Sequence, residues 1–118
     1  MLARHPLEAT VRGLTMTPAV VVKLGGGLIT DKASLTTLRA PLLSRLTKEI
    51  SAAVDAGIHV LVVHGAGSFG HLRAKAWALA EGRSDVEGND GCADQDEAVE
   101  MVRADMLALS NNVVSALL

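Results

Sequence analysis

The sequence contains almost no cysteine and very few aromatic residues. Cys92 is the only cysteine among 118 residues, Tyr is absent, and aromatic residues make up 2% of the chain. A single cysteine excludes a disulfide within the chain and a zinc site built from several thiolates, and it fits a reducing compartment. We therefore expect a cytoplasmic protein.

Long apolar runs and an excess of one charge are also missing. The apolar stretches at residues 19–24 and 60–63 are far shorter than the ~20 residues that cross a bilayer. Eleven Lys and Arg against thirteen Asp and Glu leave a formal net charge of -2, so no overall field attracts nucleic acid or an anionic membrane. We expect neither as a partner, and any bound anion must be held by local groups.

The first residues have no clear pattern. Residues 1–17 include Arg4, Glu8 and Arg12 without a continuous apolar block, so they do not have the composition of a secretory signal. We expect a disordered leader at residues 1–17, or a true start near Met16, and one domain at residues 18–118.

Two segments have the composition of strands in a parallel sheet. Residues 19–24 and 58–63 are almost entirely apolar and rich in β-branched side chains, as in strands that are buried on both faces. A predicted helix lies between them, and a right-handed crossover is the usual geometry of such a unit. The order predicts an α/β fold with a mainly parallel sheet.

Apolar residues recur at steps of three and four in the rest of the domain, which predicts amphipathic helices. The helices are expected at residues 38–56, 71–81 and 94–118, with a polar, glycine-containing loop at residues 83–94. Gly57 and Gly82 stand where a left-handed residue commonly ends a helix. Because two strands are few beside a mean of ~5–6 per sheet, the chain has the pattern of a piece of a larger α/β protein.

A glycine-rich turn follows each predicted strand, at residues 25–27 and 64–70. Ligands of open α/β sheets bind beyond the carboxyl ends of the strands, so both turns are expected to face one crevice. Glycine lets backbone N–H groups approach a phosphate closely, and successive N–H groups form a nest for an anion. The two turns therefore predict a phosphate site.

Charged side chains near these turns have a functional and a structural interpretation. Lys23 lies inside an apolar run, where a charge must be paired or point at an anion. Lys32 could be only a solvated loop residue. His71 falls in the first turn of a predicted helix, where it could donate a hydrogen bond to a phosphate or simply cap the helix. Lys75 shares that helix face, and His64 is expected to be structural.

The second turn also matches the GxGxxG pattern of dinucleotide-binding folds at residues 65–70. Such a site uses an acidic residue at the end of the next strand, ~20 residues further on. The acidic residues in that range lie in a polar loop with no strand before them, which argues against NAD.

The two motifs together resemble the amino acid kinase superfamily. The residues concerned are VKLGGGLITDK at 22–32 and VVHGAGSFGH at 62–71. Within that superfamily, Thr30-Asp31-Lys32 and the ending at residues 67–71 are similar to the isopentenyl phosphate kinases. Gly27 stands where relatives often carry Ser or Ala. The resemblance covers residues 19–118 and implies an αβα sandwich, present here as its N-terminal portion without the nucleotide-binding half.

The resemblance also implies a reaction in which ATP, accompanied by Mg²⁺, phosphorylates isopentenyl phosphate to isopentenyl diphosphate. Lys23 then matches a lysine that stabilises the transferred phosphoryl group, Lys32 matches a second lysine near the ATP phosphates, and His71 matches a histidine that binds the acceptor phosphate. Loop amides that hold phosphates are implied at Gly25, Gly26, Gly65, Ala66, Gly67 and Gly70. No residue of the chain is matched to a metal.

The partners implied are a small-molecule phosphate and either a second copy of the chain, as a homodimer, or a C-terminal half. Two alternatives remain open at this point. The chain could belong to a superfamily member that acts on a carboxylate or carbamate, or it could be a non-catalytic phosphate-binding fragment.

Overall fold

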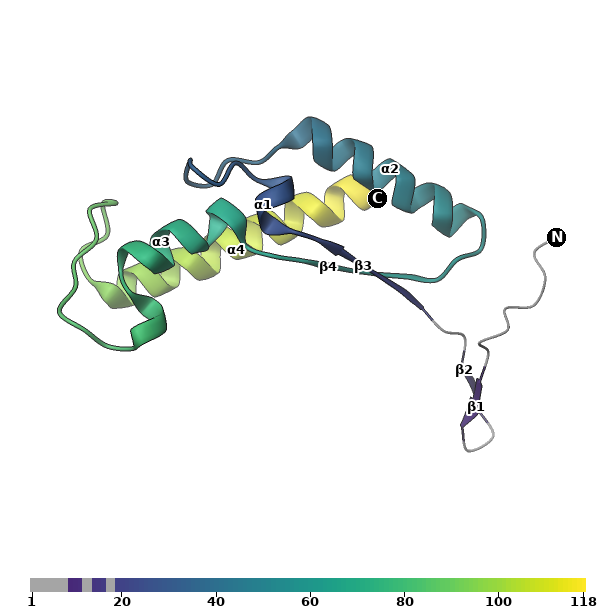
Figure 1. Cartoon of the computed structure of the whole chain (residues 1–118), viewed down its shortest axis with the longest axis horizontal. Helices are drawn as coiled ribbons and strands as arrows, with labels where there is room; N and C mark the ends of the chain where they lie inside the picture. Colours follow the sequence, from purple (N-terminus) through teal and green to yellow (C-terminus); the bar gives the residue numbers. More distant parts are fainter. Residues whose placement is uncertain (1–8, 12–13, 17–18) are drawn as a thin grey trace.

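The structure is a computed structural model that describes residues 9–11, 14–16 and 19–118 (Figure 1). Its elements in chain order are β1 (Ala9–Val11), β2 (Leu14–Met16), β3 (Val20–Leu24), α1 (Gly26–Ile29), α2 (Ala40–Asp55), β4 (Val60–His64), the 3-10 turn η1 (Gly67–Phe69), α3 (His71–Ala76), the 3-10 turn η2 (Leu79–Glu81) and α4 (Gln95–Leu117).

The strands β1 and β2 pair in antiparallel fashion, with Ala9 opposite Met16. The sequence pattern did not predict these strands, which lie within the expected leader. The other residues of that leader, 1–8, 12–13 and 17, lie outside the described part of the chain, and the expectation of disorder there stays a prediction.

The strands β3 and β4 form the predicted parallel pair. Val20 lies opposite Val60 and Leu24 opposite His64, with α2 in the connection between the strands. β4 begins two residues later than the sequence pattern indicates and includes His64. The carboxyl ends of both strands therefore lie side by side, and each leads into a glycine-rich turn.

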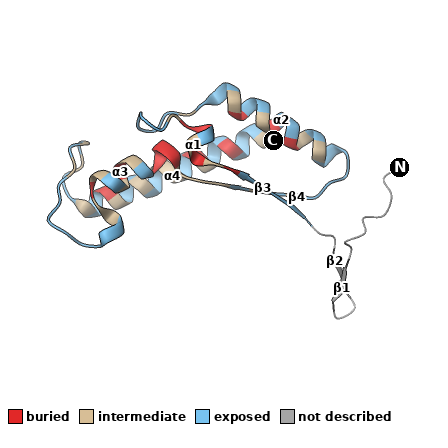
Figure 2. Cartoon of the chain, in the orientation of Figure 1, coloured by how far each residue is buried: buried red, intermediate tan, exposed pale blue. Residues whose placement is uncertain are grey.

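The helices α2 and α4 pack against each other and against one face of this sheet (Figure 1). The core between these layers consists of Leu24, Ile29, Leu43, Ile50, Phe69, Leu109 and Val113 (Figure 2). Because side chains alternate along a strand, Val22 and Val62 pack on this core, whereas Val21 and Leu61 on the other face are 61% and 57% exposed. The expectation of strands buried on both faces is therefore wrong for the described elements.

The two long helices have clear sequence signals at their ends. α2 begins at Ala40 with Pro41 in its first turn, where proline's missing N–H has no intrahelical partner to lose, and Gly57 follows its end at φ 92°. α4 begins after Asp94, whose carboxylate accepts a hydrogen bond from the Glu97 N–H at 2.8 Å. Both helices match the predicted segments to within two residues.

The third predicted helix is shorter than its apolar pattern indicates. α3 ends at Ala76, and Ala78 adopts a left-handed conformation at φ 51° before η2 and Gly82. Trp77 is 2% exposed, and its carbonyl accepts a hydrogen bond from Gln95 Nε2 at 3.1 Å. Tertiary contacts of Trp77 therefore replace the last turns of the predicted helix. Residues 83–94 form the predicted loop without helix or strand.

None of the helices in the described ranges has both the length and the apolar composition that crossing a membrane requires.

Candidate functional site

The two glycine turns meet backbone to backbone at the carboxyl ends of β3 and β4. A Cβ atom added to Gly26 would overlap the amide nitrogen of Gly67 and would lie 2.8 Å from its Cα. A Cβ added to Gly65 would lie 3.0 Å from the Gly26 nitrogen. Gly67 itself has φ 49°, which side-chain-bearing residues rarely adopt. The turns can approach this closely only because these positions lack side chains, and the two glycine turns therefore lie together at one edge of the sheet, while a ligand crevice beside them stays a prediction.

The buried hydroxyl group of Thr30 joins the turns, and the buried Ser68 ties the second turn to residues 36–37. Thr30 Oγ1 accepts a hydrogen bond from the Ser68 N–H at 3.0 Å and donates one to the Gly26 carbonyl at 2.6 Å. The Ser68 carbonyl accepts a hydrogen bond from the Thr36 N–H at 3.0 Å. The sequence interpretation used Thr30 and Ser68 only as members of the two motifs and gave neither of them a role in the site. The available signal was a small hydroxyl residue beside each glycine turn.

The backbone amides predicted to hold phosphates fall into two groups. The Gly65 N–H donates to the Leu24 carbonyl at 3.1 Å, and the Gly70 N–H donates to the Gly67 carbonyl at 3.3 Å. Among the described residues, Gly25, Gly26, Ala66 and Gly67 do not donate their N–H groups to another backbone carbonyl. Gly26 and Gly67 are buried in the contact between the turns, whereas Gly25 and Ala66 are partly exposed. Gly25 and Ala66 are therefore better placed than Gly65 and Gly70 to offer a free donor to a ligand.

The two predicted lysines lie on different elements beside these turns. Lys32 folds back over the first turn, because a Cβ added to Gly27 would lie 2.5 Å from Lys32 Cε and 3.4 Å from its Nζ. Lys23 pairs with Val63 in the sheet register and is exposed on the uncovered face, beside Val21. The structure thus brings Lys32 against the glycine turns, and it places Lys23 one residue before the end of its strand.

His71 is the first residue of α3, directly after the second turn, and its side chain is exposed. α3 packs against α4, the helix on the covered face of the sheet. The hydrogen bonds and ion pairs of the described residues do not join His71 to Lys23, so the convergence of these two groups stays a prediction. His64 Nδ1 lies 3.0 Å from the Gly65 carbonyl oxygen. The expected structural role of His64 stays a prediction.

The family model described as "Amino acid kinase family" matches residues 18–118. The chain belongs to the amino acid kinase family. The resemblance read from the two motifs is thereby confirmed, and so is the α/β fold with a parallel strand pair.

Relatives within the amino acid kinase family include an isopentenyl phosphate kinase of Thermoplasma acidophilum, 40% identical over 60 residues. That match covers 51% of this chain and 23% of the relative. A crystal structure of the T. acidophilum isopentenyl phosphate kinase product complex is similar with a TM-score of 0.66 and 31% identity over 85% of this chain. A substrate complex of isopentenyl phosphate kinase gives a TM-score of 0.63 at 31% identity over 84% of this chain.

The chain spans 38% and 37% of the length of these two solved kinases. The described residues contain no group of three or more His, Cys, Asp or Glu side chains that could hold a metal ion. Mg²⁺, which the resemblance to the family implies, is therefore not assigned to any of these described residues.

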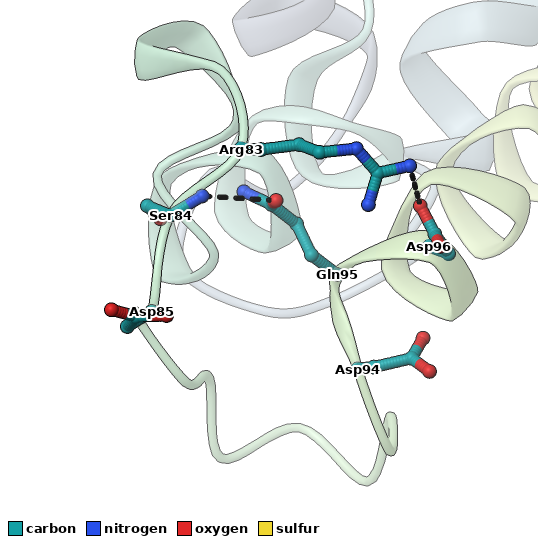
Figure 3. A pocket seen from close by; sticks show the side chains of 6 residues that line it. All are labelled: Arg83, Ser84, Asp85, Asp94, Gln95 and Asp96. Carbon is teal, nitrogen blue, oxygen red and sulfur yellow. Dashed lines mark hydrogen bonds and ion pairs between the residues drawn. The ribbon is translucent and has the colours of Figure 1, made fainter.

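This family member also has a hollow of about 470 Å³ away from the glycine turns, between the start of α4 and the loop before it (Figure 3). Across it, Arg83 pairs with Asp96 at 3.0 Å, and the Ser84 N–H donates to Gln95 Oε1 at 3.4 Å. Arg83 and Asp96 are 83% and 71% exposed, so their attraction is largely screened by water. The hollow lacks the glycine backbone that distinguishes the candidate site.

Proposed function

We propose that this chain forms the acceptor-binding part of an ATP-dependent kinase that converts isopentenyl phosphate to isopentenyl diphosphate. The observation that carries the proposal is the contact of Gly26 with Gly67 at the carboxyl ends of two parallel strands. Lys32, folded over the first of these turns, supports it. A cytoplasmic location belongs to the same proposal.

Phosphoryl transfer requires positioning and neutralisation of oxygen charges more than covalent help from the protein. In this proposal Gly25 and Ala66 offer backbone N–H groups to phosphate oxygens, and the ammonium groups of Lys23 and Lys32 offset the charge that spreads over the transferred group. His71 donates a hydrogen bond to the acceptor phosphate. Because that acceptor is already anionic at neutral pH, the chain needs no strong general base.

ATP supplies the transferred phosphoryl group, and Mg²⁺ accompanies it. The free amides of Gly25 and Ala66 and the nearby Lys32 fit a polyphosphate chain. In the proposal, residues 18–118 are the N-terminal part of the kinase domain, and the nucleotide-binding half comes from further residues or another chain. A homodimer, as the family resemblance implies, belongs to the proposal as well.

Kinetics of alanine variants in the complete enzyme test these roles. Lys23→Ala and His71→Ala are each expected to lower kcat/KM at least tenfold, equivalent to ~1.4 kcal/mol of transition-state stabilisation. Lys48→Ala is the matched control, because Lys48 is an exposed lysine on α2. Turnover of both site variants at the wild-type rate would remove the site assignment.

A panel of acceptors tests the substrate. Isopentenyl phosphate is expected to be phosphorylated in preference to carboxylate and carbamate acceptors at equal concentration. Preference for a carboxylate would instead assign the chain to another branch of the family. One further candidate is a phosphate-binding fragment that works with a partner chain. Binding of isopentenyl phosphate without turnover, with turnover restored by an added nucleotide-binding chain, would support that candidate.

A further inference from the structure

The short helix α3 has two distinct sides. Arg73 and Trp77, four residues apart, are 7% and 2% exposed. His71 and Lys75, also four residues apart, are both exposed. Residues at this spacing share one side of a helix, and a step of two residues leads to the opposite side. The burial of Arg73 and Trp77 therefore determines the direction in which His71 and Lys75 point.

A single carboxylate binds both of these buried residues, Arg73 within α3 and Trp77 directly after its end. Asp90 Oδ2 lies 2.8 Å from Arg73 Nη1, and Asp90 Oδ1 accepts a hydrogen bond from Trp77 Nε1 at 2.9 Å. The same Oδ1 accepts the Cys92 N–H at 3.2 Å. The side chains of Arg73 and Asp90 are each 8% exposed. Two contacts one helical turn apart fix the rotation of α3 about its axis, because a single contact would leave that rotation free.

Further contacts tie this arrangement to α4 and to the loop. Arg73 Nη2 lies 3.6 Å from Asp105 Oδ2 on α4, and Arg73 Nη1 donates to Cys92 Sγ at 3.1 Å. Gly88 lies against the Trp77 ring, since a Cβ added there would be 2.8 Å from Cδ1. We name Arg73, Trp77, Asp90, Cys92 and Asp105 the Asp90 cluster. A helix of six residues has little stability alone, so α3 depends on this cluster for its orientation.

We infer that Asp90, acting through Arg73 and Trp77, is a positioning residue for His71 in acceptor binding. The inference rests on the proposed function, because it takes His71 as the group that contacts the acceptor phosphate. Asp90 does not touch the acceptor itself. It holds the buried side of α3 against the loop and α4, and the exposed side with His71 and Lys75 thereby faces outward beside the second glycine turn. The cluster links residues 83–94, a loop without regular structure, to the geometry of the site.

Steady-state kinetics of Asp90→Asn in the complete enzyme test the inference. The substitution keeps the shape of the side chain and removes its charge, so the α3 rotation is expected to loosen. We expect the KM for isopentenyl phosphate to rise at least fivefold, while kcat and the KM for ATP stay within twofold of wild type. The matched control is Asp96→Asn, which removes an exposed aspartate from an ion pair near the same loop. It is expected to leave all three constants within twofold.

A double variant covers the case in which Asp90→Asn folds poorly. Arg73→Gln combined with Asp90→Asn removes both charges of the 2.8 Å pair and leaves only Asp105, whose side chain is 17% exposed, without the guanidinium. It is expected to reproduce the rise in acceptor KM. An acceptor KM within twofold of wild type in the folded double variant would overturn the inference. A fall in apparent kcat alone, with both KM values unchanged, would overturn it too. A smaller fraction of active enzyme, and not a misplaced His71, explains that pattern.

Labelling of Cys92 separates this inference from the proposed function. The Cys92 N–H contacts Asp90, and the Cys92 thiol contacts Arg73. A thiol reagent such as DTNB is therefore expected to react at least fivefold faster with Asp90→Asn than with wild type. Unchanged labelling would show that Asp90 does not hold the loop and would overturn the inference. Faster labelling in an enzyme that neither binds nor phosphorylates isopentenyl phosphate would refute the function, and with it the role of His71 on which the inference rests.

Discussion

The junction of the glycine turns and the Asp90 cluster fix neighbouring parts of the candidate site by different physical means. At the junction, Gly26 and Gly67 touch through their backbones, and the neutral hydroxyl group of Thr30 completes the contact by bonding the Gly26 carbonyl and the Ser68 N–H. In the cluster, a guanidinium and a carboxylate with 8% exposed side chains meet at 2.8 Å. The first arrangement depends on the absence of side chains, and the second on the pairing of charges.

This difference determines which substitutions each region tolerates. A close backbone contact fails when any Cβ is added, whatever its polarity, because packed atoms cannot move apart without cost. A buried ion pair fails when one partner is removed, because the other charge remains without compensation, yet the pair can be replaced as a whole at little cost. The comparison therefore predicts distinct responses to single and double substitutions.

The largest expected effect on stability follows the removal of one partner of the buried Arg73–Asp90 pair. Arg73→Met is expected to lower the free energy of unfolding by about 3 kcal/mol, because Asp90 is then buried without its cation. Arg83→Met is the control, since the Arg83–Asp96 pair is 83% and 71% exposed, and its loss is expected to cost below about 1 kcal/mol. Urea denaturation of both variants measures the difference. Equal midpoints for the two variants would show that the Asp90 cluster contributes no more than a surface ion pair.

A somewhat smaller effect is expected at the junction of the glycine turns. Gly26→Ala should lower the free energy of unfolding by about 2 kcal/mol, because its Cβ would overlap the Gly67 backbone. Gly25→Ala is the stability control, since its Cβ would meet only Leu28 Cβ at 3.9 Å. Urea midpoints again provide the measurement. If Gly25→Ala proved as destabilising as Gly26→Ala, the contact between the turns would not explain the requirement for glycine.

The sequence predicted the junction and not the cluster, for physical reasons. The strand pattern of residues 19–24 and 58–63 places two glycine turns at one edge of a parallel sheet, and local composition is sufficient for that inference. Arg73 lies in α3, whereas Asp90 lies in a loop whose composition indicates only that it is polar. No periodicity shows which charged residue of such a loop turns inward, so their pairing becomes visible only in the folded chain.

The remaining differences also arise from tertiary structure. The apolar residues of β3 and β4 predict burial on both faces, but the described elements cover one face, and Val21 and Leu61 stay exposed. The pattern at residues 71–81 predicts one helix, but the contacts of Trp77 end α3 early. In both cases the local sequence favours one structure, but contacts with neighbouring elements, or the lack of such contacts, determine the structure that forms.

The smallest expected effect is a dependence of stability on acid pH, which the cluster produces and the glycine junction does not. Burial alone would raise the pKa of Asp90, but hydrogen bonds from Trp77 and the Cys92 N–H, together with the Arg73 charge, outweigh it and lower the pKa below the ordinary value of 3.8. A group whose pKa is lower in the folded than in the unfolded state stabilises the protein at pH values above its ordinary pKa. This stabilisation is lost as the pH falls through the pKa of the folded state.

Between pH 6 and pH 3, the urea midpoint of wild type is therefore expected to fall further than that of Asp90→Asn, which has no proton to bind at this position. Asp105 also faces Arg73, at 3.6 Å, and is present in both proteins, so the difference between the two curves reports the Asp90 carboxylate. The junction residues Gly26, Thr30, Gly67 and Ser68 carry no titratable group, and Thr30→Val is expected to keep the wild-type pH dependence at a lower overall stability. Parallel curves for wild type and Asp90→Asn would show that charge pairing does not distinguish the cluster from the junction.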